Sequence, residues 1–155
     1  LSEIGPMKYT TKGFSMIELV IVILIGSILT SIAFSSFSSV MGGYAVRGAR
    51  DAFASMHARA RTRAIEAGST IHFFVSASGD SIVVRNGTTV VDMLDYDSEL
   101  EVDVAMTSDS LRLCMNSRGY ADDECNSFTN ATTVRFIQNA DTASLIVLPL
   151  GQLVY

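Results

Sequence analysis

A single carboxylate, Glu18, lies at the start of a long uncharged segment. From Leu19 to Tyr44 the sequence contains no charged residue. Such a segment can span a bilayer, because roughly 20 helical residues at about 1.5 Å each cover the hydrocarbon core. A carboxylate in hydrocarbon is costly unless a cation pairs with it, so acids there are candidates for functional sites. Two hypotheses stand for Glu18: it pairs with a cation at the same depth, or it stabilises the positive end of a helix dipole at the interface.

Cys114 and Cys125 are the only two cysteines and lie eleven positions apart in an acidic region. Lys8 and Lys12 precede the apolar segment. Positive charge on this flank stays on the cytoplasmic side, so we expect the remainder of the chain to be exported. In an oxidising compartment we expect a disulfide, worth roughly 2–3 kcal/mol in the chain-entropy account. The alternative is two free buried thiols.

Five arginines follow the apolar segment, and they suggest the hypothesis that this part of the chain binds an anion. They are Arg47, Arg50, Arg59, Arg61 and Arg63. At about 100° per residue one flank of the helix carries Arg47, Arg50 and Arg61. The opposite flank carries Arg59 and Arg63, so the five arginines do not form a single basic ridge. Contact with the phosphates of DNA or anionic lipid is one interpretation. We favour pairing with acids, because residues 69–155 contain four Arg against twelve Asp and Glu, a net charge of −8.

Other kinds of site find little support in the sequence. Acidic residues alternate over one stretch and begin like a calcium-binding loop: Asp95, Asp97, Glu99, Glu101 and Asp103. The sixth position of such a loop would be Leu100 rather than Gly and the twelfth Met106 rather than Glu, so acids on the solvent face of a strand are favoured. His57 and His72 are not spaced as zinc ligands, and no catalytic or phosphate-binding motif occurs. We therefore expect no enzyme, no metal site and no cofactor.

The first element that positions these residues is one long helix. Gly42 and Gly43 predict a point where this helix bends or melts, since each glycine costs about 1 kcal/mol in a helix interior. A continuous apolar stripe then follows the helical period: Val46, Ala49, Phe53, Met56, Ala60 and Ala64. Gly68 is placed to end the helix as its C′ residue. The stripe predicts that the second half of the helix packs under the domain that follows.

After Gly68 the pattern changes to period two with short turns. The expected strands are Thr70–Ser76, Ser81–Arg85, Thr89–Leu94, Leu100–Val104, Leu111–Met115, Thr133–Gln138 and Ser144–Leu148. Turns are expected at residues 77–80, 86–87 and 139–141. The fold class is therefore α+β, a long N-terminal transmembrane helix packed against a small antiparallel β-sheet domain. Two hairpins or a small sandwich would both satisfy this pattern.

The residues at the start of the apolar segment match a known family. The run Gly13-Phe14-Ser15-Met16-Ile17-Glu18-Leu19 resembles the class III signal of type IV pilins and type II secretion pseudopilins, usually Gly-Phe-Thr-Leu-Ile-Glu-Leu. The resemblance implies cleavage after Gly13 by the membrane-embedded prepilin peptidase and N-methylation of Phe14. The new α-amine of Phe14 is then a cation for Glu18, in the same chain or a neighbour. Pairing across chains would set the stagger of subunits in a filament.

The resemblance also implies how the chain is divided and where it acts. We expect a leader at residues 1–13, a transmembrane and filament-core half-helix at 14–43, an exposed half-helix at 44–68 and a β-rich domain at 69–155. The subunit would be a single-pass inner-membrane protein with its C-terminal domain in the periplasm, later incorporated into a pilus or pseudopilus. Expected partners are other pilins or pseudopilins, the prepilin peptidase and the inner-membrane assembly platform. An ordinary secretory signal would instead predict a mature terminus near Phe34.

The order of elements in the C-terminal region narrows the resemblance. Residues 57–64 stand before the first strand, residues 111–114 and 118–119 follow, and a terminal hairpin ends at residues 148–153. This layout is similar to the GspH/FimT group of minor pseudopilins and minor pilins, which implies a subunit near the filament tip that primes assembly. Some members act as DNA receptors through a basic tail after the last glycine. Here Gly151 is followed by Gln-Leu-Val-Tyr, so DNA binding is possible but not favoured.

Overall fold

The computed structural model describes residues 13–76, 81–108, 110–122 and 125–155. Two compact units divide the chain, residues 1–38 and residues 39–155. Residues 1–12 of the predicted leader, with Lys8 and Lys12, lie outside the described residues. The predicted turn at residues 77–80 lies outside them as well.

Helix α1 (Met16–Ala67) contributes to both units. Its C-terminal half has a buried face, and the six residues of the predicted stripe are each no more than 2% exposed: Val46, Ala49, Phe53, Met56, Ala60 and Ala64. The prediction of this stripe is confirmed. Gly68 follows the last helical residue with φ +59°, and its N–H donates to the Ile65 carbonyl at 3.3 Å. It ends the helix as predicted, because glycine adopts the left-handed conformation without a steric penalty.

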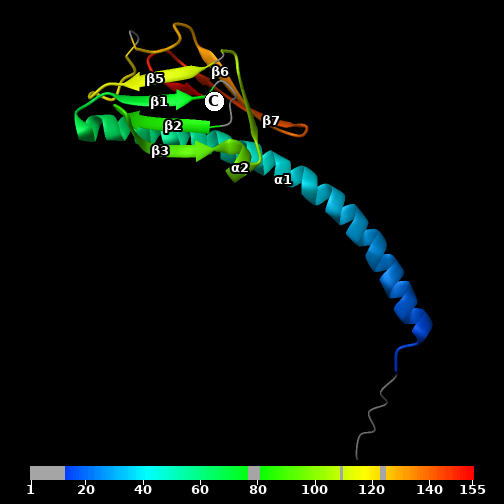
Figure 1. Cartoon of the computed structure of the whole chain (residues 1–155). Helices are drawn as coiled ribbons and strands as arrows, with labels where there is room; N and C mark the ends of the chain where they lie inside the picture. The colour runs from blue at the N-terminus through cyan, green and yellow to red at the C-terminus, as the bar shows by residue number, and fades with distance from the viewer. Residues whose placement is uncertain (1–12, 77–80, 109, 123–124) are drawn as a thin grey trace, which may run out of the picture. The chain divides into compact units, whose positions relative to one another are not determined.

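The first sheet lies against the C-terminal half of α1 and is antiparallel throughout (Figure 1). Its spatial order is β3-β2-β1-β5. The strands are β1 (Ile71–Val75), β2 (Ser81–Asn86), β3 (Thr89–Asp95) and β5 (Leu111–Met115). Ile71, Phe73 and Val75 alternate with half-buried neighbours and point into the core, which is the pattern of a strand with one covered face.

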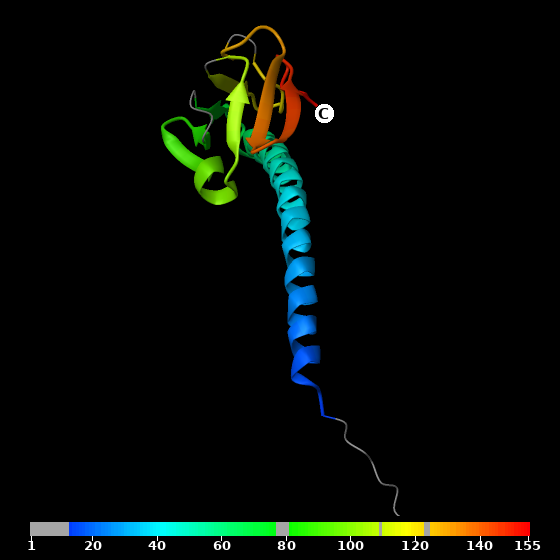
Figure 2. The same ribbon diagram turned by 90° about the vertical axis from the view of Figure 1, so that its right-hand side faces the viewer.

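The second sheet contains the strands that close the chain, and its hairpin of β6 and β7 is the orange pair in Figure 2. Its spatial order is β4-β6-β7-β8, again antiparallel. The strands are β4 (Asp103–Met106), β6 (Thr132–Gln138), β7 (Asp141–Val147) and β8 (Leu153–Val154). The last strand predicted from the sequence therefore begins three residues earlier than expected, and the short β8 was not predicted.

The core of residues 39–155 forms where α1 meets both sheets. Phe53 is fully buried and lies edge-on against Phe73 of β1, with ring centroids 5.4 Å apart. It also lies edge-on against Phe136 of β6 at 6.0 Å. Tyr96 packs on Phe136 as well, with ring centroids 5.6 Å apart. One helical residue thus joins the helix to the two sheets.

Gly42 and Gly43 do not break the helix, since α1 continues through both. The prediction that the helix melts there was wrong, and the alternative, that it bends there, stays a prediction. A Cβ on Gly42 would lie 2.5 Å from Oδ2 of Asp141, the first residue of β7. The missing side chain therefore makes room for the hairpin turn between β6 and β7, where Asn139 adopts a positive φ of 55°.

The alternating acids do not lie along one strand, so that prediction was also wrong. Asp95 ends β3 and Asp103 begins β4, whereas Asp97 and Glu99 lie in a short helix, α2 (Tyr96–Leu100). The strand expected over residues 100–104 begins only at Asp103. Asp95 caps this helix by accepting a hydrogen bond from the Ser98 N–H at 3.0 Å. Glu101 ends it with φ 53°. Tyr96 is fully buried and anchors the turn in the core.

Candidate functional site

The predicted cut site precedes α1. Gly13, Phe14 and Ser15 have no regular structure, and the helix begins at Met16. Phe14 is 79% exposed. Nothing lies within 4 Å of the place that a Cβ on Gly13 would occupy. The Gly13–Phe14 bond is thus exposed and outside the helix, as a peptidase requires of its substrate.

Glu18 lies in the first turn of α1, and its backbone N–H donates to the Ser15 carbonyl at 3.0 Å. The first turn is where a negative charge stabilises the helix dipole. Among the described residues its carboxylate has no ion-pair partner. The side chain is exposed and open to a cation from another part of the chain or from another molecule.

The segment that contains Glu18 can cross a membrane by its length and composition. The candidate span covers Met16–Phe34, 19 residues with a mean hydropathy of 2.5, none of it buried within the structure. Two of its hydroxyl groups donate inside the helix: Ser27 Oγ donates to the Leu24 carbonyl at 2.8 Å and Thr30 Oγ1 to the Gly26 carbonyl at 2.7 Å. These side chains therefore need no water to complete their hydrogen bonds.

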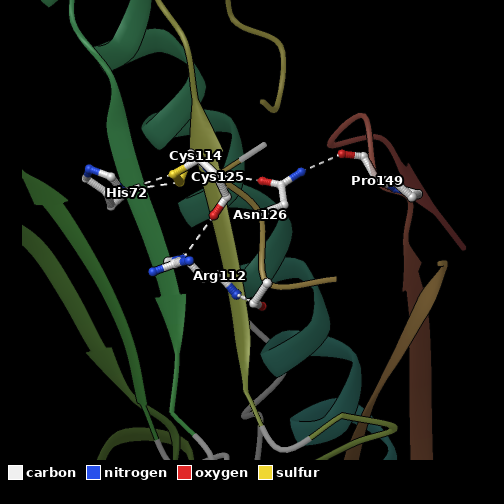
Figure 3. Close-up of a disulfide and its surroundings, with 7 residues drawn as sticks. His72, Arg112, Cys114, Cys125, Asn126 and Pro149 are labelled. Carbon is white, nitrogen blue, oxygen red and sulfur yellow. Dashed lines mark hydrogen bonds between the residues drawn. A yellow bond between two sulfur atoms is a disulfide. The ribbon is translucent and has the colours of Figure 1, made fainter. Parts of the chain in front are cut away.

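Cys114 and Cys125 form the expected disulfide, with Cα atoms 5.8 Å apart (Figure 3). The segment that carries Cys125 covers the free edge of β5. Ser127 N–H donates to the Arg112 carbonyl at 3.1 Å and Asp122 N–H to the Cys114 carbonyl at 2.8 Å. In return Arg112 N–H donates to Ser127 Oγ at 2.8 Å. The disulfide therefore fastens a segment that already completes the hydrogen bonding of an edge strand.

The arginines of α1 lie on two flanks, as the helical period predicts. Arg50 stacks over Tyr155 at 5.3 Å and Arg61 over Tyr120 at 5.7 Å. Arg59 pairs instead with Asp92 of β3 at 3.2 Å. Arg50 also pairs with its neighbour Asp51 at 3.1 Å. Arg47 and Arg63 are exposed. Within the described ranges, Arg59 is thus the one arginine of this set that pairs with an acid of the β-domain.

Comparisons with known proteins agree with these features. Residues 9–34 match the prokaryotic N-terminal methylation motif. The fold matches two crystal forms of the type IV minor pilin FimU from Pseudomonas aeruginosa. One match has a TM-score of 0.52 at 14% identity and covers 70% of this chain and 86% of FimU. The other has a TM-score of 0.50 at 13% identity, with 70% and 90% covered. No curated protein sequence matches the chain.

The chain carries the N-terminal methylation motif and has a pilin-like fold. Its apolar N-terminal helix, methylation motif and antiparallel sheets confirm the resemblance and the fold class predicted from the sequence.

Two polar residues of the pilin-like domain were not predicted to matter. Asn126 ties the Cys125 segment to both neighbours: its Oδ1 accepts from the Cys114 N–H at 3.0 Å, and its Nδ2 donates to the Pro149 carbonyl at 2.7 Å (Figure 3). His57 of α1 lies in the core, edge-on to Phe73 at 5.9 Å. For Asn126 the signal available in the sequence was its position directly after Cys125. For His57 the signal was its position beside Met56 of the buried stripe.

We expect Asn126→Ala to lower the free energy of unfolding of the full chain in detergent by about 2 kcal/mol. The substitution leaves the N–H of the fully buried Cys114 without its acceptor, and an unsatisfied buried donor costs about 1–3 kcal/mol. Thermal unfolding followed by near-ultraviolet circular dichroism measures the change. Asn130→Ala is the matched control, because Asn130 is exposed, and it should change little. Equal effects of the two substitutions would contradict the role of Asn126.

We expect the folded chain to lose stability in acid because of His57. Burial, with a smaller effect of the positive charge of Arg61, lowers the pKa of His57 to about 4, and a hydrogen bond with the Gly151 backbone opposes both. The unfolded chain binds a proton near pH 6.5, so this stability is complete above pH 6.5 and is lost as the pH falls toward 4. The loss from this group should reach about 3 kcal/mol at pH 4.

The measurement compares the pH dependence of unfolding in wild type and His57→Leu between pH 7 and pH 4. The leucine variant should lose less stability in acid than wild type. Parallel curves for wild type and His57→Leu would show that another group titrates.

Proposed function

We propose that this pilin-like chain is a minor pilin or minor pseudopilin, a structural subunit that assembles with other pilins through its N-terminal helix. The observation that carries the proposal is the methylation motif over residues 9–34, which includes the apolar helical segment Met16–Phe34, none of it buried. An apolar surface of this kind needs lipid or neighbouring helices to cover it. The same surface can lie in the inner membrane first and pack against neighbouring subunits in the filament afterwards.

Processing supplies the group that Glu18 needs. Prepilin peptidase cleaves after Gly13, and the new α-amine of Phe14, which is then methylated, lies four residues before Glu18. Residues four apart are neighbours on a helix, so the pair can form within one chain, or the amine can reach Glu18 of an adjacent subunit. In an apolar filament core an unpaired charge is costly, and the pairing therefore fixes the axial register of the subunits.

The proposal also gives the subunit a cellular location and partners. The subunit inserts in the inner membrane with its C-terminal domain in the periplasm, and the inner-membrane assembly platform moves it into a type IV pilus or a type II secretion pseudopilus. A position at or near the tip, where it primes assembly, follows the layout of the GspH/FimT group. The disulfide supports an oxidising compartment for the C-terminal domain.

Mass spectrometry of the mature N-terminus tests this function. The full chain is produced in a bacterium with a prepilin peptidase and in a matched strain without it. We expect a methylated Phe14 terminus in the first strain and the uncleaved chain in the second. A Gly13→Leu variant should stay uncleaved in both strains. A terminus near Phe34 would identify an ordinary secretory signal, and any terminus other than methylated Phe14 would refute the proposal.

DNA binding is a second candidate function, and one observation favours it. On one flank of α1, Arg50 and Arg61 each stack with an exposed tyrosine, Tyr155 and Tyr120. Grooves that hold single-stranded DNA combine arginines with aromatic rings on which bases stack. The net charge of −8 over residues 69–155 opposes this function, because it repels phosphate at long range.

Binding of labelled single-stranded DNA by the full chain in detergent decides between these views. DNA binding predicts affinity at low salt that falls with salt concentration and drops at least about tenfold in an Arg50→Gln, Arg61→Gln double variant. Arg85→Gln, on the exposed end of β2, is the control. Absence of binding at low salt would exclude this candidate.

A further inference from the structure

His72 lies against the two sulfur atoms of the disulfide (Figure 3). Its Nδ1 is 3.3 Å from Cys114 Sγ and 4.0 Å from Cys125 Sγ. The three atoms all lie within 4.8 Å of one another. An imidazole nitrogen and two thiolate sulfurs are the ligands that Zn²⁺ prefers in proteins.

Two of these residues are held by the sheet itself. His72 of β1 is paired directly opposite Cys114 of β5 in the antiparallel ladder. Their side chains therefore point to the same face, and their separation does not depend on the disulfide. The imidazole also stacks on Phe74, with ring centroids 5.9 Å apart and planes at 26°. The first two ligands are thus positioned by regular structure.

The third residue is held by hydrogen bonds as well as by the disulfide. Arg112 Nε donates to the Cys125 carbonyl at 3.1 Å. The next residue, Asn126, is fixed by its bonds to Cys114 and Pro149. These bonds remain available after reduction, and they keep Cys125 beside the other two residues.

We propose that the reduced chain binds one Zn²⁺ ion through His72 Nδ1, Cys114 Sγ and Cys125 Sγ. A thiol or phosphine reductant supplies two electrons, the solvent supplies two protons, and the disulfide becomes two thiols. Zn²⁺ binding then releases both thiol protons to the solvent. Two thiolates and a neutral imidazole balance the charge of the ion, and water takes the fourth position of the tetrahedron.

Zinc and the disulfide exclude each other, because they use the same two sulfur atoms. Before oxidation the ion would hold the Cys125 segment on the edge of β5, and oxidation would release it. Sequence spacing gives no sign of such a site, since the ligands come from two separate strands and a loop. The inference is independent of filament assembly.

Cobalt binding tests the proposal, because Co²⁺ replaces Zn²⁺ and its thiolate bonds absorb in the near ultraviolet. The full chain is purified in detergent, reduced with a phosphine and titrated with Co²⁺, and Zn²⁺ is then added as competitor. We expect one Co²⁺ per chain, a thiolate charge-transfer band and its loss on addition of Zn²⁺. The oxidised chain should show no band.

Variants separate the three-ligand site from chelation by two thiols alone. His72→Gln should weaken Co²⁺ binding by about tenfold or more, since loss of even an outer-shell partner has effects of that size. His57→Gln removes the other histidine of the chain and should leave binding unchanged. Equal affinity of wild type and His72→Gln would overturn the proposal.

Far-ultraviolet circular dichroism of the reduced chain accompanies each titration. If the reduced chain keeps its fold and binds no Co²⁺, the proposal is wrong. If reduction unfolds the β-domain, Zn²⁺ must restore the folded spectrum, because binding and folding are then coupled. Failure of Zn²⁺ to restore it would also overturn the proposal.

Discussion

Phe53→Ala is expected to lower the free energy of unfolding by about 3–5 kcal/mol, the range for removing a buried aromatic side chain. Phe53 is fully buried, and its ring contacts Phe73 of the first sheet and Phe136 of the second. The substitution leaves a cavity where the helix and both sheets meet, and it removes two edge-on aromatic contacts. Denaturation of the full chain in detergent, followed by near-ultraviolet circular dichroism, measures the loss.

Tyr44→Ala is the matched control for Phe53→Ala. Tyr44 is an aromatic residue of the same helix that is 66% exposed, so its replacement should change stability by less than about 0.5 kcal/mol. A change of similar size in the two variants would mean that the helix does not depend on this core contact.

Glu18→Gln is expected to reduce incorporation of the subunit into filaments by at least about tenfold while processing continues. Glutamine keeps the size of the side chain and removes the charge that would pair with the Phe14 α-amine. Breaking a buried ion pair costs about 3–5 kcal/mol, which is more than the roughly 1.4 kcal/mol of a tenfold effect. Immunoblots of sheared filaments measure the incorporated subunit, and immunoblots of membranes measure the subunit that is not incorporated.

Three further measurements make the Glu18 result specific. Mass spectrometry should find the methylated Phe14 terminus in Glu18→Gln, which shows that the chain was cut. Glu18→Asp keeps the negative charge and should retain some of the incorporation into filaments. Glu66→Gln changes another exposed acid of α1 and should assemble normally. Normal incorporation of Glu18→Gln would exclude Glu18 as the registry contact.

Local periodicity was enough to predict much of the fold. The stripe from Val46 to Ala64 follows the helical period without a break, and all its residues are buried. Strands β1, β2, β3, β5 and β6 lie within about one residue of their predicted bounds. In β1, for example, buried and half-buried positions alternate, which is the period-two pattern of a strand. Gly68 ends the helix for a reason that is also local.

The features that sequence reasoning missed depend on contacts between distant residues. Tyr96 is drawn into the core against Phe136, and this overrides the period-two alternation of the acids around it. The space at Gly42 is set by Asp141, which lies far along the chain at the start of β7. A single sequence contains no direct record of either contact.

For the candidate site, too, some features could be predicted from the local sequence and others depended on contacts between distant residues. Gly13, Phe14 and Glu18 are recognisable because a short motif and an uncharged segment stand together in the sequence. The disulfide followed from the cysteine count and the expected compartment. The approach of His72 to both sulfurs depends on the pairing of β1 with β5, which brings together residues 42 positions apart. Strand order was the missing information.

The covered edge of β5 has a consequence for contacts between copies of the folded domain. An open strand edge is a template on which a strand of another molecule can add. Here the segment around Cys125 occupies that edge through bonds to Arg112 and Cys114. The closed disulfide fastens this segment, so the edge of β5 is not open to a strand of another molecule.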